Sequence, residues 1–433
     1  MILRRFIPLL ALSALTLAAA SPALAQSQQP PATPTPQPSP TPAPPRIVAG
    51  QDGFAIESAN GDFRLQFGML AHLDGRFALG DENEQVVDTF AVRRARAYLR
   101  GRVSRRFEFY LNPDFAGGTF TLQDAYVDTV FSPAFRIRAG KAKTPFGFER
   151  LLSVSNSLFL ERAFPTAIAP NRDIGVQILG DISGGLISYL AGVTNGVADG
   201  ASSDTETNDS KDVSGRIVLR PFAKRAPTHP GRGVALGLSG TRGRATGAGA
   251  LPTFKTQTLQ QTFFTYAAGA TPAVADGIRT RYSPSVWYLR GPFGGWGEYV
   301  HSEVPVRRGS VVQDVAHDAW QVAASWVLTG EAATDASTGV RPKHNFDFGN
   351  GHWGAFQVSA RYHVLEIDDK AFTFGLAAAG SSRKAEAWTV GLRWYLNGNV
   401  WYTVNFERTV FDGNSKGPRR AENGLAFRTQ LYF

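Results

Sequence analysis

The segment Ala91–Val103, with the sequence AVRRARAYLRGRV, concentrates fixed positive charge. Its five arginines are Arg93, Arg94, Arg96, Arg100 and Arg102. The guanidinium group stays charged at any working pH and binds phosphate oxygens through paired hydrogen bonds. Such a cluster could contact nucleic acid, cover a solvated helix face, or line a passage for anions. The apolar residues between the arginines fit both a helical and a strand period, so the rest of the chain must decide.

Catalytic and metal chemistry have little support in the sequence. The seven histidines lack the spacing of metal ligands, and no G-x-S-x-G motif is present. The segment His344–His352, HNFDFGNGH, could form a metal loop, but ordinary loop polarity explains it more simply. Because the chain has no cysteine, it has no disulfide, thiolate metal site or cysteine nucleophile. We therefore expect no cofactor and no enzyme activity, although a hydrolase site assembled across strands is an alternative.

The N-terminus predicts export. Two arginines precede an apolar run over residues 6–20, and Ala-Leu-Ala at residues 23–25 is a small-x-small cleavage site. We expect residues 1–25 to be a signal peptide that is removed before Gln26. The alternative, an uncleaved anchor, would need a longer run to cross a bilayer. The mature chain keeps a net charge of +7 from the +9 of the full chain, which suggests an anionic partner. Export argues against nucleic acid as that partner.

Residues 26–46 are rich in proline that alternates with small polar residues. Such a sequence stays extended and does not pack, so we predict a disordered periplasmic linker. The folded part then spans residues 47–433. No second linker interrupts it, and turn residues recur throughout, which indicates one domain.

In this folded part, apolar and polar residues alternate with a period of two. Examples are FRLQFGMLAHLDGR at residues 63–76 and AWTVGLRWYL at residues 387–396. The final segment, LAFRTQLYF, shows the same pattern and ends in Phe433. Alternation of this kind is typical of half-exposed antiparallel strands, and strands that face hydrocarbon must close into a barrel. We predict an all-β fold, a transmembrane antiparallel β-barrel of about 16 strands. A secreted β-sandwich or solenoid is the alternative.

Aromatic residues and long connectors agree with a barrel. The turn Asn397–Asn399 is flanked by aromatic side chains that we expect in an interfacial girdle. They are Trp388, Trp394, Trp401 and Tyr402. The polar connectors Gly80–Asp88 and Val197–Asp212 are predicted to be outer loops.

The polar faces of the predicted strands repeatedly carry arginine. These residues are Arg64, Arg94, Arg96, Arg100, Arg136, Arg138, Arg216, Arg361, Arg393 and Arg428. Rings of basic side chains select anions in pores. Acidic residues could balance this charge and leave only mild selectivity, namely Glu108, Asp124, Asp128, Glu149 and Glu407. A general, weakly selective diffusion porin is therefore the first alternative to an anion channel.

Several motifs, in order along nearly the whole mature chain, resemble the phosphate- and polyphosphate-selective porins of the porin O/P type. They are VRRAR at residues 92–96, LQDAYVD at 122–128, RAGKAKTPFGFE at 138–149, LER at 160–162, NRDIGVQILG at 171–180, WVLTGE at 326–331, GAFQVSARYHVLEI at 354–367 and VGLRWYLNGNVWYTVNF at 390–406. The resemblance implies a 16-stranded barrel, usually trimeric, whose third loop folds into the lumen. It also implies that lumenal basic residues attract the anion to a constriction.

The resemblance assigns constriction roles to individual residues. The paired arginines of the family motif correspond to Arg93 and Arg94, the strand aspartate to Asp124, and the basic loop residue to Arg150. Ser153 matches a family loop serine. The next residue is valine where the family has a second hydroxyl, which is a departure from the phosphate-coordinating pattern. We expect residues 144–173 to narrow the lumen and to bring Arg150 and Ser153 near Arg94 and Asp124.

Together these observations predict an outer-membrane porin for passive diffusion of small anions, with phosphate or polyphosphate as the expected solute. Expected partners are outer-membrane lipid and lipopolysaccharide, two further copies in a homotrimer, and the barrel-assembly machinery, which would read the strand ending at Phe433. The predicted pore-lining and anion-binding residues are Arg93, Arg94, Arg96, Arg100, Asp124, Arg136, Arg138, Arg150, Ser153, Arg361 and Arg393.

Overall fold

The computed structural model describes residues 44–433 except 51, 81–85, 207 and 414–416. The predicted signal peptide and nearly all of the predicted linker lie outside the described residues. Among the described residues, the helices are too short or too polar to cross a bilayer.

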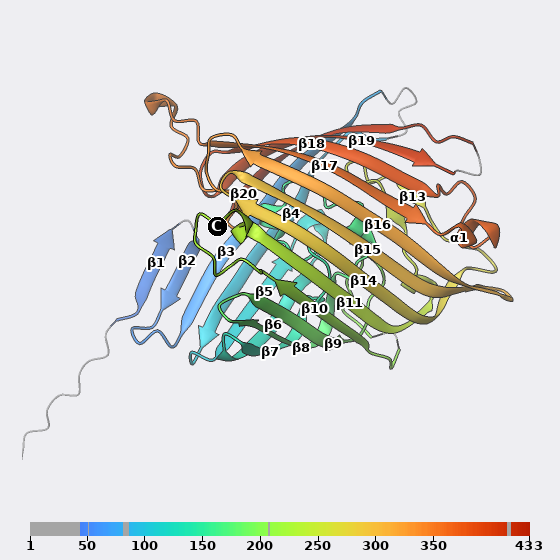
Figure 1. Cartoon of the computed structure of the whole chain (residues 1–433), viewed down its shortest axis with the longest axis horizontal. Helices are drawn as coiled ribbons and strands as arrows, with labels where there is room; N and C mark the ends of the chain where they lie inside the picture. The colour runs from blue at the N-terminus through green and yellow to red at the C-terminus, as the bar shows by residue number, and fades with distance from the viewer. Residues whose placement is uncertain (1–43, 51, 81–85, 207, 414–416) are drawn as a thin grey trace, which may run out of the picture. The chain divides into compact units, whose positions relative to one another are not determined.

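The described residues form a closed barrel of sixteen antiparallel strands, as the alternation predicted (Figure 1). Each strand pairs with the next in the barrel, and pairing of the last strand with the first closes the sheet. The strands are β3 (Arg64–Ala78), β4 (Thr89–Val103), β5 (Phe107–Asp114), β6 (Thr121–Ser132), β7 (Phe135–Lys143), β8 (Arg172–Ile182), β9 (Ile187–Thr194), β10 (Asp212–Leu219), β11 (Val234–Gly247), β14 (Val274–Arg290), β15 (Phe293–Arg308), β16 (Val311–Val327), β17 (Ala355–Ile367), β18 (Lys384–Tyr395), β19 (Val400–Asp412) and β20 (Glu422–Tyr432).

The predicted two-residue period sets which side chains face the interior. In β20, Arg428 and Gln430 are buried inside the barrel, whereas Phe427 is exposed on the outside. The opposite faces of a strand therefore meet opposite environments, a polar lumen and an apolar exterior.

A hairpin precedes the barrel, which the sequence analysis did not foresee. It consists of β1 (Arg46–Gly50) and β2 (Gly53–Glu57), and β2 pairs with the beginning of β3. The ring of Phe54 packs edge-on against the ring of Phe433, with 5.9 Å between their centroids. The hairpin thus extends the sheet at the end of the barrel where the chain terminates.

One residue of the predicted aromatic girdle lies on the wrong side. Trp388 and Tyr402 are exposed on the outside, as expected. Trp401 is fully buried inside the barrel, where it packs against Tyr395 and Val340. The prediction for Trp401 was wrong because it is adjacent to Tyr402 in β19, and neighbouring strand residues point to opposite faces.

The long connectors occupy both ends of the barrel. The described residues of the predicted outer loops, 80 and 86–88 in the first and 197–206 and 208–212 in the second, lie at the end opposite the C-terminus, as do residues 144–171 between β7 and β8, which we call loop 3. The connector between β11 and β14 carries the short strands β12 (Phe254–Lys255) and β13 (Thr262–Phe264), and α1 (Asp369–Thr373) follows β17. At the C-terminal end, the connector of residues 328–354 between β16 and β17 is much longer than a hairpin turn.

Loop 3 folds into the barrel, as the resemblance implied, and helps to fill part of it. An apolar cluster joins loop 3, the β11–β14 connector and inward-facing residues of β15 to β18. Its members include Phe146, Phe164, Ile168, Phe254, Phe263, Phe264, Val300, Val304, Val315 and Leu365. A second cluster places Phe148 and Phe159 of loop 3 against Trp287 and Trp296. The interior beside β14 to β18 is therefore packed.

Deleting Phe433 is expected to impair barrel closure. Its amide and carbonyl bond to the carbonyl and amide of Met69 at 3.1 and 3.0 Å, and its carbonyl also accepts from the hydroxyl of Tyr98. Without these bonds, backbone groups at the start of β3 stay unpaired where the last strand meets the first. A smaller heat-modifiable, folded fraction on electrophoresis would show the defect. The control Phe54→Ala removes only the ring contact and should assemble normally; equal folded fractions in both variants would contradict the prediction.

Candidate functional site: the lumen beside loop 3

Loop 3 is irregular, so its buried backbone depends on side chains of the barrel wall. Glu298 of β15 accepts hydrogen bonds from the amides of Phe148 at 2.6 Å and Glu149 at 3.2 Å. Gly147 has a φ of +72°, and a Cβ there would lie 2.8 Å from the Glu298 carboxylate. The Pro-Phe-Gly-Phe-Glu sequence thus turns so that its amides meet one buried carboxylate.

Wall arginines satisfy the carbonyls of loop 3. Arg361, Arg393 and Arg428 donate to the carbonyls of Glu161, Ser157 and Leu160, respectively. Arg361 also pairs with Glu407 at 3.2 Å. Arg361 and Arg393 were predicted to line the pore, but their side chains are buried beneath loop 3. Their observed contacts hold the loop in position.

A β-bulge explains why Arg93 and Arg94 both point inward. The register between β3 and β4 shifts so that His72 faces Arg94 and Leu73 faces Val92, which leaves Arg93 as the extra residue. A bulge lets two consecutive residues project to one side of a sheet. In the predicted alternation, Arg93 lies outside the polar face that carries Arg94 and Arg96.

The two arginines meet a carboxylate of loop 3. Glu161 pairs with Arg93 at 2.7 Å, with Arg76 of β3 at 2.5 Å, and with Arg94 at 3.7 Å. Burial alone would raise the pKa of Glu161, but these arginines hold the pKa of its carboxyl well below the usual range. Glu161 is therefore an ionised clamp between loop 3 and the β3–β4 wall.

Further along the wall, most of the predicted arginines are paired with acids. Three of these pairs are Arg96–Asp114 at 2.7 Å, Arg138–Asp128 at 2.7 Å and Arg136–Glu108 at 3.2 Å, and Arg172, which was not predicted, pairs with Asp124 at 2.9 Å. Partly buried pairs of this kind fix the positions of both groups and reduce the field that each one projects. The arginine row is thus largely compensated, as the general-porin alternative anticipated.

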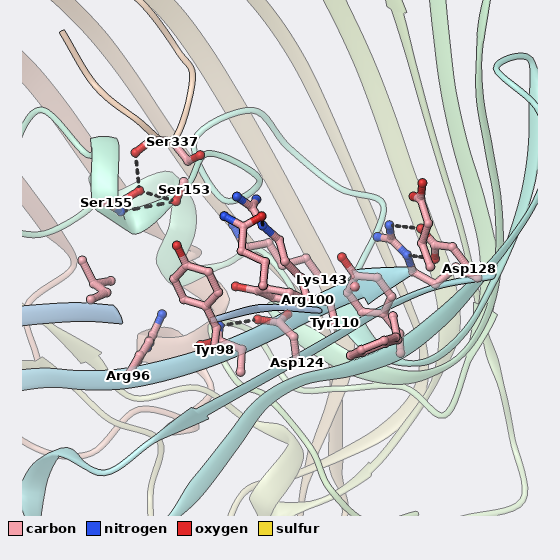
Figure 2. A pocket seen from close by; sticks show the side chains of 18 of the residues that line it. Arg96, Tyr98, Arg100, Tyr110, Asp124, Asp128, Lys143, Ser153, Ser155 and Ser337 are labelled. Atoms are coloured by element: carbon pink, nitrogen blue, oxygen red, sulfur yellow. Dashed lines mark hydrogen bonds and ion pairs between the residues drawn. The ribbon is translucent and has the colours of Figure 1, made fainter. Parts of the chain in front are cut away.

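A cavity of about 600 Å³ lies between these strands and loop 3 (Figure 2). Seven basic and three acidic residues are among the described residues that line it. Arg100 donates only to the amide oxygen of Gln66 at 3.1 Å, and Lys143 donates to the carbonyls of Leu151 and Leu152. Among the described residues, neither cation has a carboxylate partner. The cavity therefore holds more positive than negative charge.

The structure brings part of the predicted constriction together. The cavity wall contains Arg96, Arg100, Asp124, Arg138 and Ser153. Arg93, Arg94 and Arg136 do not line it, and neither do Arg361 and Arg393.

Arg150 also lies apart from the expected site. Its guanidinium is buried and donates to the carbonyl of Thr166, within loop 3 itself. Burial, together with the nearby charges of Arg162 and Arg172, lowers the pKa of Arg150 to about 9. The expected meeting of Arg150 with Arg94 and Asp124 at this cavity is not seen.

Several cavity residues were missed by the sequence analysis. They are Tyr98, Tyr110, Tyr126, Lys143, Ser155, Arg172, Ser337 and Tyr432. The four strand tyrosines occupy polar-face positions of the predicted alternation, and this signal could have identified them. Ser337 could not have been found in this way, because the connector of residues 328–354 folds back toward loop 3.

The histidine-rich segment forms a turn. The rings of His344 and His352 stack with 4.5 Å between their centroids. Within the described part of the chain, no group of three or more potential metal ligands comes together.

Replacing Glu161 with glutamine should destabilise the barrel in a pH-dependent way. Three arginines then lose their shared carboxylate, which is expected to lower the free energy of unfolding by about 3 kcal/mol at pH 7. A carboxyl with a depressed folded pKa stabilises the protein above its unfolded pKa of about 4.3 and loses this contribution as the pH falls. The difference in the free energy of unfolding between the variant and the wild type should therefore be smaller at pH 3 than at pH 7, as measured by urea unfolding in detergent. The control Glu108→Gln, in a half-exposed pair, should cost less than about 1 kcal/mol; a pH-independent gap for Glu161→Gln would refute the clamp.

Solved structures with a similar fold are outer-membrane proteins. An OmpT loop-deletion mutant from Vibrio cholerae matches with a TM-score of 0.54 and 11% identity, covering 86% of this chain and all of that chain. The outer-membrane-expressed OmpT of Vibrio cholerae matches with a TM-score of 0.51 and 11% identity, covering 90% and 100%. An in-vitro-folded trimer form of OmpT matches with a TM-score of 0.50 and 12% identity, covering 86% and 99%.

No curated protein matches the sequence closely enough to count as a relative. The family comparison is more specific, since residues 63–433 match the model described as phosphate-selective porin O and P. These residues span the whole barrel, loop 3 and the cavity. The chain therefore belongs to the family of phosphate-selective porins O and P and is an outer-membrane porin.

Proposed function

We propose that this porin preferentially passes small anions, with phosphate or polyphosphate as the natural solute. The observation that carries the proposal is the excess of basic over acidic residues around the cavity beside loop 3. In a narrow passage with low-dielectric walls, such an excess concentrates counter-ions. The paired arginines contribute little to this excess, so the preference rests mainly on Arg100 and Lys143.

Arg100 and Lys143 differ in their access to solute. Arg100 is exposed to the lumen, so its guanidinium can exchange water for a phosphate oxygen. Lys143 is more enclosed, and its ammonium group donates hydrogen bonds to two carbonyls of loop 3. Arg100 is therefore the first contact for an anion. A general porin would instead show little dependence on Arg100.

The remaining partners follow from the outer-membrane location. We propose that residues 1–25 direct export and are removed, and that residues 26–46 link the barrel on the periplasmic side. The apolar exterior would contact lipid and lipopolysaccharide, and the strand ending at Phe433 would be read by the assembly machinery. The trimer form of the structurally similar OmpT supports a homotrimer here. Membership of a porin family supports a channel over the hydrolase alternative.

Replacing Arg100 with glutamine should reduce anion preference. One of the two unpaired cations is then lost, so the ratio of anion to cation permeability is expected to fall about twofold or more. Reversal potentials under a salt gradient in planar bilayers measure this ratio directly. Arg105→Gln is the matched control, because it removes the same charge from an exposed turn where Arg105 pairs with Asp62. If both variants keep the wild-type ratio, Arg100 does not set selectivity.

Cysteine substitution should distinguish the exposed from the buried part of loop 3. The native chain has no cysteine, so a single introduced thiol reports its own surroundings. Ser153→Cys, in the cavity wall, should react with a small charged thiol reagent and lower the single-channel current. Arg150→Cys should react much more slowly, because position 150 is buried. The reverse order of reactivity would show that the conducting path runs elsewhere.

A further inference from the structure

Four tyrosines form a continuous row along the cavity. They are Tyr432, Tyr98, Tyr110 and Tyr126, and successive ring centroids lie 6.1, 6.0 and 5.7 Å apart. Tyr110 and Tyr126 face each other directly across β5 and β6. On β3, the residue facing Tyr98 is Gly68, and any side chain there would collide with the tyrosine ring. The row is thus a continuous surface to which several strands contribute. A residue larger than glycine at position 68 would disrupt it.

Conduction of a bare anion does not require this surface. The face of an aromatic ring carries a partial negative charge, so it repels an inorganic phosphate ion. The same face attracts cations and packs well against apolar C–H groups. A row of rings inside a positively charged cavity therefore fits a solute that carries both an anionic group and an organic body.

Basic side chains flank the row and leave room for both parts of such a solute. The guanidinium carbon of Arg138 lies 3.9 Å from the ring centroid of Tyr126, and that of Arg100 lies 5.8 Å from that of Tyr98. Arg138 is already paired with Asp128, whereas Arg100 has no carboxylate partner among the described residues. An anionic group bound by Arg100 would hold its organic body against the neighbouring rings.

Hydroxyl groups face the row from the other side of the cavity. Figure 2 shows Ser153, Ser155 and Ser337 on one side, with Tyr98 and Tyr110 pointing into the space from the strands. The hydroxyls of Ser153 and Ser155 lie 2.7 Å apart. Hydroxyl groups both donate and accept hydrogen bonds, so they suit a body that itself carries several hydroxyls. The volume of about 600 Å³ is within the usual range for a small-molecule site.

We propose that the cavity binds phosphorylated sugars, with the phosphate on Arg100, the sugar ring against Tyr110 and Tyr126, and the sugar hydroxyls toward Ser153. This inference rests on the proposed anion-selective function and narrows its substrate class. The solute moves through the lumen by exchanging one tyrosine face for the next. Binding at several weak positions lets it enter and also leave.

The test compares two phosphate esters that differ in the ring. In planar bilayers, glucose 6-phosphate should half-block the chloride current at a concentration about fivefold lower than glycerol 3-phosphate does. The double variant Tyr110→Leu/Tyr126→Leu should remove this difference and leave the block by glycerol 3-phosphate within about twofold. Tyr402→Leu, on the exposed outer face, is the matched control and should behave as wild type.

The outcomes separate this inference from the proposed function. If the wild-type channel is anion selective but both esters block equally, the sugar-phosphate site is overturned and the anion function stands. If reversal potentials show no anion preference, the proposed function itself fails. Should the double variant not assemble, the comparison of the two esters on the wild-type channel still decides, because it needs no substitution.

Discussion

The buried backbone of loop 3 imposes the strongest constraint on this barrel. The loop crosses the lumen with two short 3-10 turns, Val154–Asn156 and Phe164–Ala167, and is otherwise irregular. Many of its amides and carbonyls therefore need partners that the wall must supply. Glu298 accepts two of the amides, and Arg361, Arg393 and Arg428 donate to three of the carbonyls. The polar side chains on this wall therefore match the backbone of loop 3 in one particular conformation. This loop conformation determines which part of the interior is filled and where the cavity lies.

This constraint divides the lumenal arginines by what they contact. Those beneath loop 3 bind its backbone, and those on the β4 to β8 wall mostly pair with acids. Each such pair lowers the net electrostatic field in the lumen. A count of arginines in the sequence does not distinguish paired from unpaired residues. In the proposed anion channel, selectivity would then depend on cations that have no carboxylate partner among the described residues, such as the exposed Arg100. The number of arginines on the polar faces overstates the charge that a passing ion meets.

The alternation in the sequence was sufficient for the barrel, because alternation is a local property that each strand carries by itself. The inward third loop was expected from the family resemblance. The sequence was insufficient where the outcome depended on register or on a distant segment. Arg93 points inward through a bulge that only the β3–β4 pairing reveals. Trp401 turned inward because its neighbour Tyr402 occupies the outer face. Arg361 and Arg393 carry the right pattern for the lumen, but the loop that covers them is more than 190 residues away.

The one-sided placement of charge also shapes how a solute would be held. Loop 3 and the packed clusters occupy one side of the interior, so an anion meets cations from the β3 to β8 wall and hydroxyls from the loop. A phosphate enclosed by cations on every side would bind tightly and leave slowly, whereas contact from one side favours exchange. The tyrosine row lies along the same charged wall, which lets an organic body add affinity without adding charge. The arginine can then set how strongly the solute is attracted, and the extent of its contact with the tyrosine rings can set how readily it is released.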